Sequence, residues 1–405
     1  FYASRALHIL NVLMGNIEMQ GGLIIPKGAA DCGIKGIRNL DCPKPDIRRG
    51  DGVGWKYKHF DKGPGLAHLF FNTMLSEDPY PIKAWIAMRH DPFCAMPDPQ
   101  FQKRAMDKCE LLVSIDTHYS EFGWYADVIL PESTYLERDN PICMQKGLKP
   151  RLAVRRKAVE PVFDTKPGWE IFKQLAERLD IGSYFPYSTI EELWAWQLEP
   201  TGYTIKDFEE KGFVSLTDKP IMYDRDKLDG QFKTPSGKIE IISKKLTDAG
   251  LPSLKEYQSP IKPPKGMFRL VYGRSAVHTH GHTINNPLLS ELMPENTLWI
   301  NTRAADKLGI NHGDLVDVLS EDNSYAGTIH ANVTDFIHPE SVYTVHGFGR
   351  QIPLQTRAYH AGLSDQKLMV GKLDDWDQAG GAVNLCEAFV VVRRSTRNPK
   401  RRVEL

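Results

Sequence analysis

Long apolar runs are absent from this chain of 405 residues, and none approaches the roughly 20 residues that a membrane span requires. An excess of charge of either sign is also absent, because 51 basic side chains balance 51 acidic ones. Bulk electrostatics therefore gives no support for nucleic acid as a partner. The remaining composition, 41% hydrophobic and 25% charged, is that of a globular protein long enough for two or three domains.

Paired cysteine motifs are absent as well. Six cysteines lie at positions 32, 42, 94, 109, 143 and 386, and no two have CxxC spacing. This excludes a zinc ribbon and a run of iron–sulfur ligands, and buried free thiols are the expectation for all six. We expect no metal ligand in this chain.

An initiator methionine is missing, and the chain opens inside a helical pattern. Phe1 is followed by Leu7, Leu10 and Met14, which recur as the apolar positions of one helix face do. A domain seldom starts within a helix. We therefore expect this chain to be the C-terminal portion of a longer protein.

Residues 111–140 form the most informative stretch. One apolar run, Leu111–Val113, leads to Asp116, and a second, Ala126–Leu130, stops at Glu132. Short apolar runs bounded by polar residues are typical of buried strands in a parallel sheet, whose ligands bind at the carboxyl ends of the strands. Both acids are expected there. Asp116 either accepts hydrogen bonds from a ribose or a guanine edge or caps a helix, and the spacing favours neither.

A second strand–loop–helix pattern precedes this stretch. Ile82–Ala87 is the expected strand, Arg89 and His90 lie in the following loop, and a helix is expected over Gln100–Lys108. This order is typical of a phosphate site, although a solvated surface loop is the commoner role for a lone Arg-His pair. Two such patterns in series favour a Rossmann-like α/β domain with a parallel sheet.

The composition and the hydrophobic pattern of the sequence change near residue 260. Pro252–Gly266 holds four prolines and three lysines, a linker composition, and predicts two domains over residues 1–260 and 261–405. Short strands separated by turn signals then predict a β-barrel. The expected strands are Phe268–Tyr272, Leu298–Ile300, Leu315–Leu319, Ala326–Val333, Ser341–Val345 and Ala388–Val392.

Three alternating histidines, at 278, 280 and 282, dominate the segment GRSAVHTHGHT. On a strand they would share a face, but ligands from one strand converge poorly on a tetrahedral zinc ion. We rank a zinc site third, and solvated or core histidines second. The first interpretation is a loop whose Arg, Ser and His donors bind an anionic or heteroaromatic ligand.

Four stretches together resemble the dimethyl sulfoxide reductase family of molybdopterin enzymes. They are LNVLMGNIEMQGG, YADVILPESTYLERDN, FKTPSGKIEI and the GRSAVHTHGHT loop that leads into the β-rich region. Within that family, YPIKAWIAMRHDPF, ADVILPESTYLERD and FKTPSGKIE are most similar to the catalytic subunit of thiosulfate or polysulfide reductases. The resemblance spans nearly the whole chain but only the second half or so of such a subunit.

The resemblance implies a set of cofactor-binding residues, each taken from a matching motif. They are Lys27 and Gly28 in a covering loop; Arg89, His90 and Pro92 beside a guanine dinucleotide arm; Asp116 and Ser120 at a guanosine; Arg274, Ser275, His278 and His280 on the pterin; and Asn384 near a pterin. Asp91 stands where relatives often carry asparagine. We expect His346 and Arg350, in VHGFGR, to be structural, and the resemblance leaves the catalytic residues unknown.

The resemblance also implies a cofactor, a fold and partners. The cofactor would be molybdenum bis(molybdopterin guanine dinucleotide), with a 4Fe-4S cluster only in an upstream region, and the barrel would be of the double-psi type. Such enzymes reduce a sulfur–sulfur bond in a small inorganic substrate. They work with an iron–sulfur electron-transfer subunit and a membrane anchor subunit, in the periplasm or on the outer face of the cytoplasmic membrane.

Two alternatives stay open. One is another oxyanion reductase of the family, acting on arsenate, selenate or tetrathionate, and the other is a truncated, non-catalytic fragment that only binds cofactor. Whichever of these functions the chain has, we expect the α/β and barrel lobes to hold the cofactor between them. Asp116 and His278 should then face one cleft.

Overall fold

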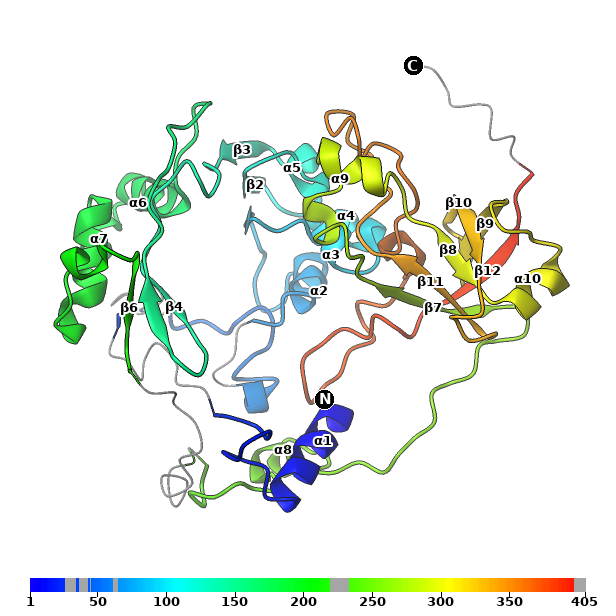
Figure 1. The fold of residues 1–405 in the computed structure, drawn as a ribbon, viewed down its shortest axis with the longest axis horizontal. Helices are drawn as coiled ribbons and strands as arrows, with labels where there is room; N and C mark the ends of the chain where they lie inside the picture. The colour runs from blue at the N-terminus through cyan, green and yellow to red at the C-terminus, as the bar shows by residue number, and fades with distance from the viewer. Residues whose placement is uncertain are drawn as a thin grey trace. The chain divides into compact units, whose positions relative to one another are not determined.

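The computed structural model describes residues 1–25, 34–35, 43, 45–60, 65–218, 232 and 234–396. They form two compact units: unit 1 contains residues 1–47 and 130–255, and unit 2 contains residues 48–129 and 256–405 (Figure 1). The chain returns to unit 2 close to residue 260. Residues 48–129 belong to unit 2 as well, so each compact unit is built from two separate stretches of the chain. The two predicted domains, residues 1–260 and 261–405, stay a prediction.

A three-stranded sheet in the order β1-β2-β3 organises the α/β part of unit 2. Strands β1 (Ala84–Met88) and β2 (Leu111–Asp116) are parallel, with Ala84 opposite Leu111 and Met88 opposite Ile115. The third strand, β3, covers Val128–Pro131. The parallel pairing confirms the α/β prediction, and burial of the middle of β2 agrees with its apolar run.

Short helices cover this sheet, and their first turns are set by side chains. The carboxylate of Asp98 accepts a hydrogen bond from Phe101 N at 2.9 Å, and Ser120 Oγ accepts one from Gly123 N at 2.9 Å. Pro92 and Pro99 stand at first helical positions, where a missing N–H costs nothing. The helices are α2 (Leu69–Ser76), α3 (Pro92–Ala95), α4 (Pro99–Met106), α5 (Glu121–Tyr125) and a 3-10 turn at Lys58–Phe60.

A closed six-stranded barrel forms the rest of the unit 2 core, in the order β10-β8-β11-β7-β12-β9. All six strands follow the predicted segments: β7 (Phe268–Gly273), β8 (Leu298–Ile300), β9 (Leu315–Ser320), β10 (Ala326–Val333), β11 (Ser341–Val345) and β12 (Phe389–Arg394). Leu270, Val342 and Val390 are fully buried in its interior. The barrel is therefore confirmed, while the double-psi type stays a prediction. Its helices are α9 (Pro287–Leu292) and α10 (Thr302–Leu308), with 3-10 turns at His280–His282 and Gln366–Leu368.

Unit 1 has a different construction, in which helices pack beside a small antiparallel sheet of β4, β5 and β6 (Figure 1). Leu152, Leu193 and Trp194 lie at the centre of its core. The strands are β4 (Cys143–Gln145), β5 (Arg151–Ala153) and β6 (Phe213–Ser215). The helices are α1 (Tyr2–Leu13), α6 (Gly168–Arg178), α7 (Ile190–Leu198) and α8 (Lys244–Asp248), with 3-10 turns at Gly182–Tyr184, Glu199–Thr201 and Ile205–Phe208.

In the segment QFKTPSGKIEII, the residues that follow the Pro-Ser-Gly turn signal do not form a strand. Residues 234–242 are turns and bends, while residues 231 and 233 lie outside the described part of the chain. Local bonds explain the difference: Thr234 Oγ1 donates to Lys238 O at 2.6 Å, and the carboxylate of Glu240 accepts from Ser236 N at 3.0 Å. Side chains thus satisfy backbone groups that a strand would pair across a ladder.

Across the described ranges, the structure contains no helix with the length and apolarity that crossing a bilayer would take.

Candidate functional site

A cavity of about 340 Å³ lies in unit 2, where the ends of β1 and β2 meet loops of the barrel. Its volume is at the low end of the range for small-molecule sites. Residues from both sides line it: Arg89, His90, Asp91, Cys94, Ala95, Asp116, His118 and Ser120 from the α/β side, and Tyr272, His280, Gly281, His282, His346, Arg350, Gln355 and Leu385 from the barrel side.

The loop after β1 is fixed across the end of β2. Arg89 has a left-handed backbone with φ of 50°, and its N–H donates to Ile115 O at 2.8 Å. Two residues later, the Asp91 carboxylate accepts hydrogen bonds from Glu121 N at 2.9 Å and Phe122 N at 3.3 Å. An acid at the start of α5 is favourable because the first backbone N–H groups of a helix have no partner within it. Asp91 thereby ties this loop to α5.

Asp116 stands at the carboxyl end of β2 with an acceptor available. Its Oδ1 accepts from Thr117 N at 2.7 Å and lies 3.6 Å from His118 Nδ1. Its Oδ2 has no hydrogen-bond partner among the residues that the structure describes. Ser120, not Asp116, caps α5. Of the two roles left open for Asp116, the helix cap is thus taken by another residue.

The barrel side of the cavity carries an ion pair to this loop. Arg350 is 5% exposed, and its Nη1 lies 2.7 Å from Asp91 Oδ2 and 2.5 Å from Cys94 Sγ. A Cβ added at Gly281 would collide with the same guanidinium, so only glycine fits there. The Arg350–Asp91 pair therefore joins the barrel loop to the α/β loop at the cavity wall.

Desolvation keeps several groups of the wall neutral. Loss of water in the cavity lowers the pKa of His90, against the opposing effect of Asp91. The pKa of His280 is lowered by desolvation and then by His346, Arg274 and His282. Burial also raises the pKa of Tyr272 to about 12, with Cys386 and Asp365 adding to the rise. Near neutral pH the wall thus offers neutral imidazoles and a phenol beside the permanent charges of two arginines.

The structure brings part of the sequence-predicted site together. Arg89, His90, Asp116, Ser120 and His280 all line the cavity. Pro92, Arg274, Ser275, His278 and Asn384 are not among its lining residues. Lys27 and Gly28 lie outside the described residues.

The expectation that His278 shares a cleft with Asp116 is not met. The His278 ring is buried, its Nε2 lies 2.9 Å from Met293 O, and it packs edge-on against Phe348. His278 precedes the 3-10 turn at His280–His282, and the two histidines of that turn both line the cavity. No cluster of His, Cys, Asp or Glu suited to a metal ion occurs within the described ranges, which leaves zinc without support.

Other predicted ligands have hydrogen-bond partners within the protein, and their contacts with a cofactor stay a prediction. Ser275 Oγ accepts from His278 N at 2.8 Å and shapes the turn. Asn384 Nδ2 donates to Asp375 Oδ1 at 2.8 Å. In unit 1, Glu132 forms a buried ion pair with Arg138 and accepts from Gly168 N at 3.0 Å. Glu132 was expected beside a ligand because it ends an apolar run, but internal partners hold its carboxylate.

The sequence interpretation favoured a structural role for His346 and Arg350, whereas both line the cavity. The signal was present in VHGFGR, where Gly347 and Gly349 both adopt positive φ, 101° and 75°. A Cβ at Gly347 would lie 2.6 Å from Gly281 N. Two glycines in such positions mark a close backbone approach, and that approach carries the flanking His and Arg to the cavity.

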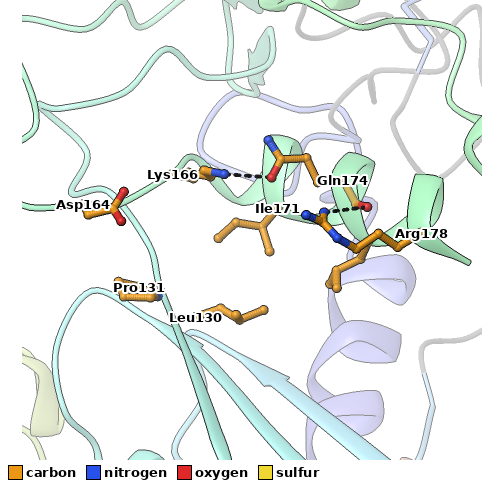
Figure 2. Close-up of a pocket in the computed structure, with 8 residues that line it drawn as sticks. Leu130, Pro131, Asp164, Lys166, Ile171, Gln174 and Arg178 are labelled. Carbon is orange, nitrogen blue, oxygen red and sulfur yellow. Dashed lines mark hydrogen bonds between the residues drawn. The ribbon is translucent and has the colours of Figure 1, made fainter.

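Unit 1 contains a second cavity of about 340 Å³, beside α6 (Figure 2). Leu130, Pro131, Ile171 and Leu175 make it largely apolar. Gln174 holds two of its three charged residues: Lys166 Nζ donates to Gln174 Oε1 at 2.8 Å, and Arg178 Nη1 donates to Gln174 O at 3.4 Å (Figure 2). Asp164 is the third. With no histidine and its cations held by neighbours, this cavity is the weaker candidate for chemistry.

Comparison with known proteins gives matches over both parts of the chain. A model of the molybdopterin oxidoreductase family matches residues 5–178, and a model of the molydopterin dinucleotide binding domain matches residues 268–382. The thiosulfate reductase molybdopterin-containing subunit PhsA of Salmonella typhimurium is 34% identical over 396 residues, which cover 89% of this chain and 51% of that protein. The dimethyl sulfoxide reductase DmsA of Escherichia coli is 28% identical and covers 83% and 45%.

A solved structure agrees with the fold. The acetylene hydratase from Pelobacter acetylenicus superposes with a TM-score of 0.66 at 20% identity, over 80% of this chain and 46% of that one. The chain spans about half the length of the curated relatives that it matches. The two matched domains support molybdenum bis(molybdopterin guanine dinucleotide) as the cofactor. The chain belongs to the molybdopterin oxidoreductases, the family that includes dimethyl sulfoxide reductase.

Proposed function

We propose that this chain is the C-terminal part of a reductase that cleaves a sulfur–sulfur bond in thiosulfate or polysulfide, and that the unit 2 cavity binds part of its molybdopterin cofactor. The observation that carries the proposal is the set of groups at the cavity. Two arginines, five histidines and an unpaired carboxylate oxygen meet where parallel strands end. This edge of an α/β sheet is where ligands bind in such folds.

The residues present fit a molybdopterin dinucleotide. Arg89 and Arg350 supply permanent positive charge for a pyrophosphate, and Asp116 Oδ2 supplies an acceptor for ring N–H groups. Arg350 Nε is buried and has no hydrogen-bond partner within the described part of the chain. Gly281 and Gly347 keep the barrel loop free of side chains where it is tightest. A cavity of about 340 Å³ holds one ring system and its linker rather than a whole dinucleotide.

The bound molybdenum would supply the two-electron chemistry of the reaction. This chain's own residues would hold the cofactor, keep its rings oriented and limit water. Their neutral imidazoles suit a site that must not repel protonated ring nitrogens. Two electrons and two protons convert thiosulfate to hydrosulfide and hydrogen sulfite, so the proposal also requires an electron donor.

Support for the sulfur substrate comes from the similarity to the thiosulfate reductase subunit. By the same similarity we propose a 4Fe-4S cluster in an upstream region, an iron–sulfur electron-transfer subunit and a membrane anchor subunit. A periplasmic site, or the outer face of the cytoplasmic membrane, belongs to the same proposal.

A second candidate is a different reaction on the same cofactor. Reduction of arsenate, selenate or tetrathionate would use the same cofactor, and the lining of the unit 2 cavity does not select among these substrates. Two of the matching proteins are named acetylene hydratases, so proteins of this fold are not all named as reductases. Fold alone therefore does not select the substrate.

The test is an assay of the full-length protein with thiosulfate, polysulfide, tetrathionate, arsenate and selenate, using a reduced viologen as electron donor. We expect viologen oxidation with thiosulfate or polysulfide and one molybdenum with two pterins per chain. Metal analysis and pterin fluorescence measure that content. Activity with arsenate or selenate alone would replace the proposed substrate, and absence of molybdenum would remove the enzyme proposal altogether.

A further inference from the structure

His346 has a fixed orientation at the unit 2 cavity. Its Nδ1 lies 2.8 Å from Asp365 Oδ2, and Asp365 is 1% exposed. The same carboxylate accepts from Gln366 Nε2 at 3.0 Å and from Gly347 N at 3.5 Å. Three donors thus converge on this buried carboxylate, and the imidazole of His346 is one of them.

This contact determines which nitrogen of His346 carries the proton. A carboxylate accepts hydrogen bonds and donates none, so Nδ1 must be the donor. In the neutral ring Nε2 is then an acceptor. Nε2 has no hydrogen-bond partner in the part of the chain that the structure describes, and His346 lines the cavity. The free acceptor therefore belongs to the cavity wall.

Two further rings of the cavity wall lie beside His346. The ring of Tyr272 lies 5.4 Å away and that of His280 5.6 Å away, centroid to centroid. His280 is itself neutral near pH 7, because desolvation lowers its pKa. Arg350, a permanent cation, lies on the same wall.

We propose that His346, held by Asp365, accepts a hydrogen bond through Nε2 from the 2-amino-4-oxopyrimidine edge that pterin and guanine share. The inference rests on the proposed binding of the cofactor in this cavity. That edge presents a ring N–H and an amino group beside a carbonyl, so it needs two acceptors and a donor. His346 Nε2 and Asp116 Oδ2 are the acceptors, and an arginine of the wall is the donor. His346 would contact the ligand, and Asp365 is a positioning residue.

A binding experiment on the full-length protein without its cofactor tests the contact. Guanosine diphosphate and 6-hydroxymethylpterin are titrated separately into the wild type, His346→Phe and His330→Phe. His330 is the matched control, because its Nδ1 lies 2.6 Å from Glu295 Oε1 but it does not line the cavity. We expect His346→Phe to weaken binding of one probe about three- to tenfold, the effect of one hydrogen bond. His330→Phe should change neither probe.

The probe that loses affinity identifies the ring bound beside His346. Loss with the pterin alone assigns the pterin edge, and loss with the nucleotide alone assigns guanine. Equal affinities in His346→Phe and His330→Phe, or failure of both probes to bind the wild type, would overturn the proposal.

A spectroscopic measurement tests the role of Asp365. In protein labelled with ¹⁵N-histidine, His346 should show a protonated Nδ1 and an unprotonated Nε2 at pH 7.5, and Asp365→Asn should remove this preference. An imidazolium, or a proton on Nε2, would contradict the assignment. Thiosulfate reduction by the holoenzyme is a separate measurement. Its absence, together with the probe and tautomer results above, would reject the sulfur substrate while leaving the His346 contact intact.

Discussion

The two cavities have the same volume, about 340 Å³, and different chemistry. The cavity of unit 1 has aliphatic walls and cations that Gln174 holds. The cavity of unit 2 has five histidines, two arginines and an acid with a free oxygen. Of the 13 histidines in the chain, only His8 falls in unit 1. Size therefore does not identify the site, whereas the convergence of titratable and charged groups does.

The largest effect should come from removing a buried charge in either unit. Arg350→Ala leaves Asp91 without its partner, and Arg138→Ala does the same to Glu132 in unit 1. Each should lower the free energy of unfolding by about 3–5 kcal/mol, because an unpaired buried carboxylate is costly. Urea denaturation followed by circular dichroism measures the loss.

The two variants should differ in cofactor content, which makes them a matched pair. Arg350→Ala should lose molybdenum and pterin at temperatures where the protein stays folded, whereas folded Arg138→Ala should keep them. Equal molybdenum and pterin content in the two variants would contradict binding of the cofactor in the unit 2 cavity.

The next effect concerns the unpaired acceptor. Asp116→Asn replaces a charged acceptor by a neutral amide of similar shape. It should lower the affinity for the cofactor about tenfold to a hundredfold, because hydrogen bonds to charged groups contribute about 1.5–3 kcal/mol. Lys166→Met in the other cavity is the control and should leave retention unchanged. Dialysis followed by metal analysis compares them. A greater loss in Lys166→Met would move the site to unit 1.

A smaller effect is expected in the pH dependence of the stability of unit 2. His68 is 5% exposed, and burial lowers its pKa, opposed by Asp374 and Asp51. The unfolded chain thus binds this proton more readily, so His68 contributes stability that is full above about pH 6.5 and lost as the pH falls. Urea midpoints for unit 2 should drop between pH 7 and pH 5, and less so in His68→Phe. The same pH dependence in both proteins would show that His68 does not cause the loss.

The smallest effect is expected at the unit 1 cavity. Gln174→Leu removes the side-chain partner of Lys166 and leaves the backbone contact of Arg178 in place. Such a change near the surface should alter unfolding free energy by less than about 0.5 kcal/mol and leave cofactor content unchanged. A loss of cofactor here would mean that the two cavities are not as different as their walls indicate.

Much of the fold was predictable because its signals are local. The apolar runs at Leu111–Val113 and Ser341–Val345 predicted strands, and those strands form where expected. Motif resemblance placed Asp116, Arg89 and His280 at a ligand, and they line one cavity. His278 could not be separated from His280 by spacing, because a contact with Met293 O from a later segment holds the His278 ring.

The missing part of the site depends on contacts between distant segments. Arg350 reaches the cavity through Asp91, which is 259 residues away in sequence. His346 faces it because Asp365, another loop residue, holds the ring. Neither pairing has a local signature, and only the glycines at 347 and 349 hinted at a close approach. Tertiary packing, not periodicity, completes the site.

An electron-density map of the cofactor-loaded, full-length protein tests the central claim most directly. The account predicts a pterin or guanine ring in the unit 2 cavity, within hydrogen-bond distance of Asp116 and His346. Density for the cofactor against Leu130, Lys166 and Ile171, with only water between Asp116 and His346, would contradict it.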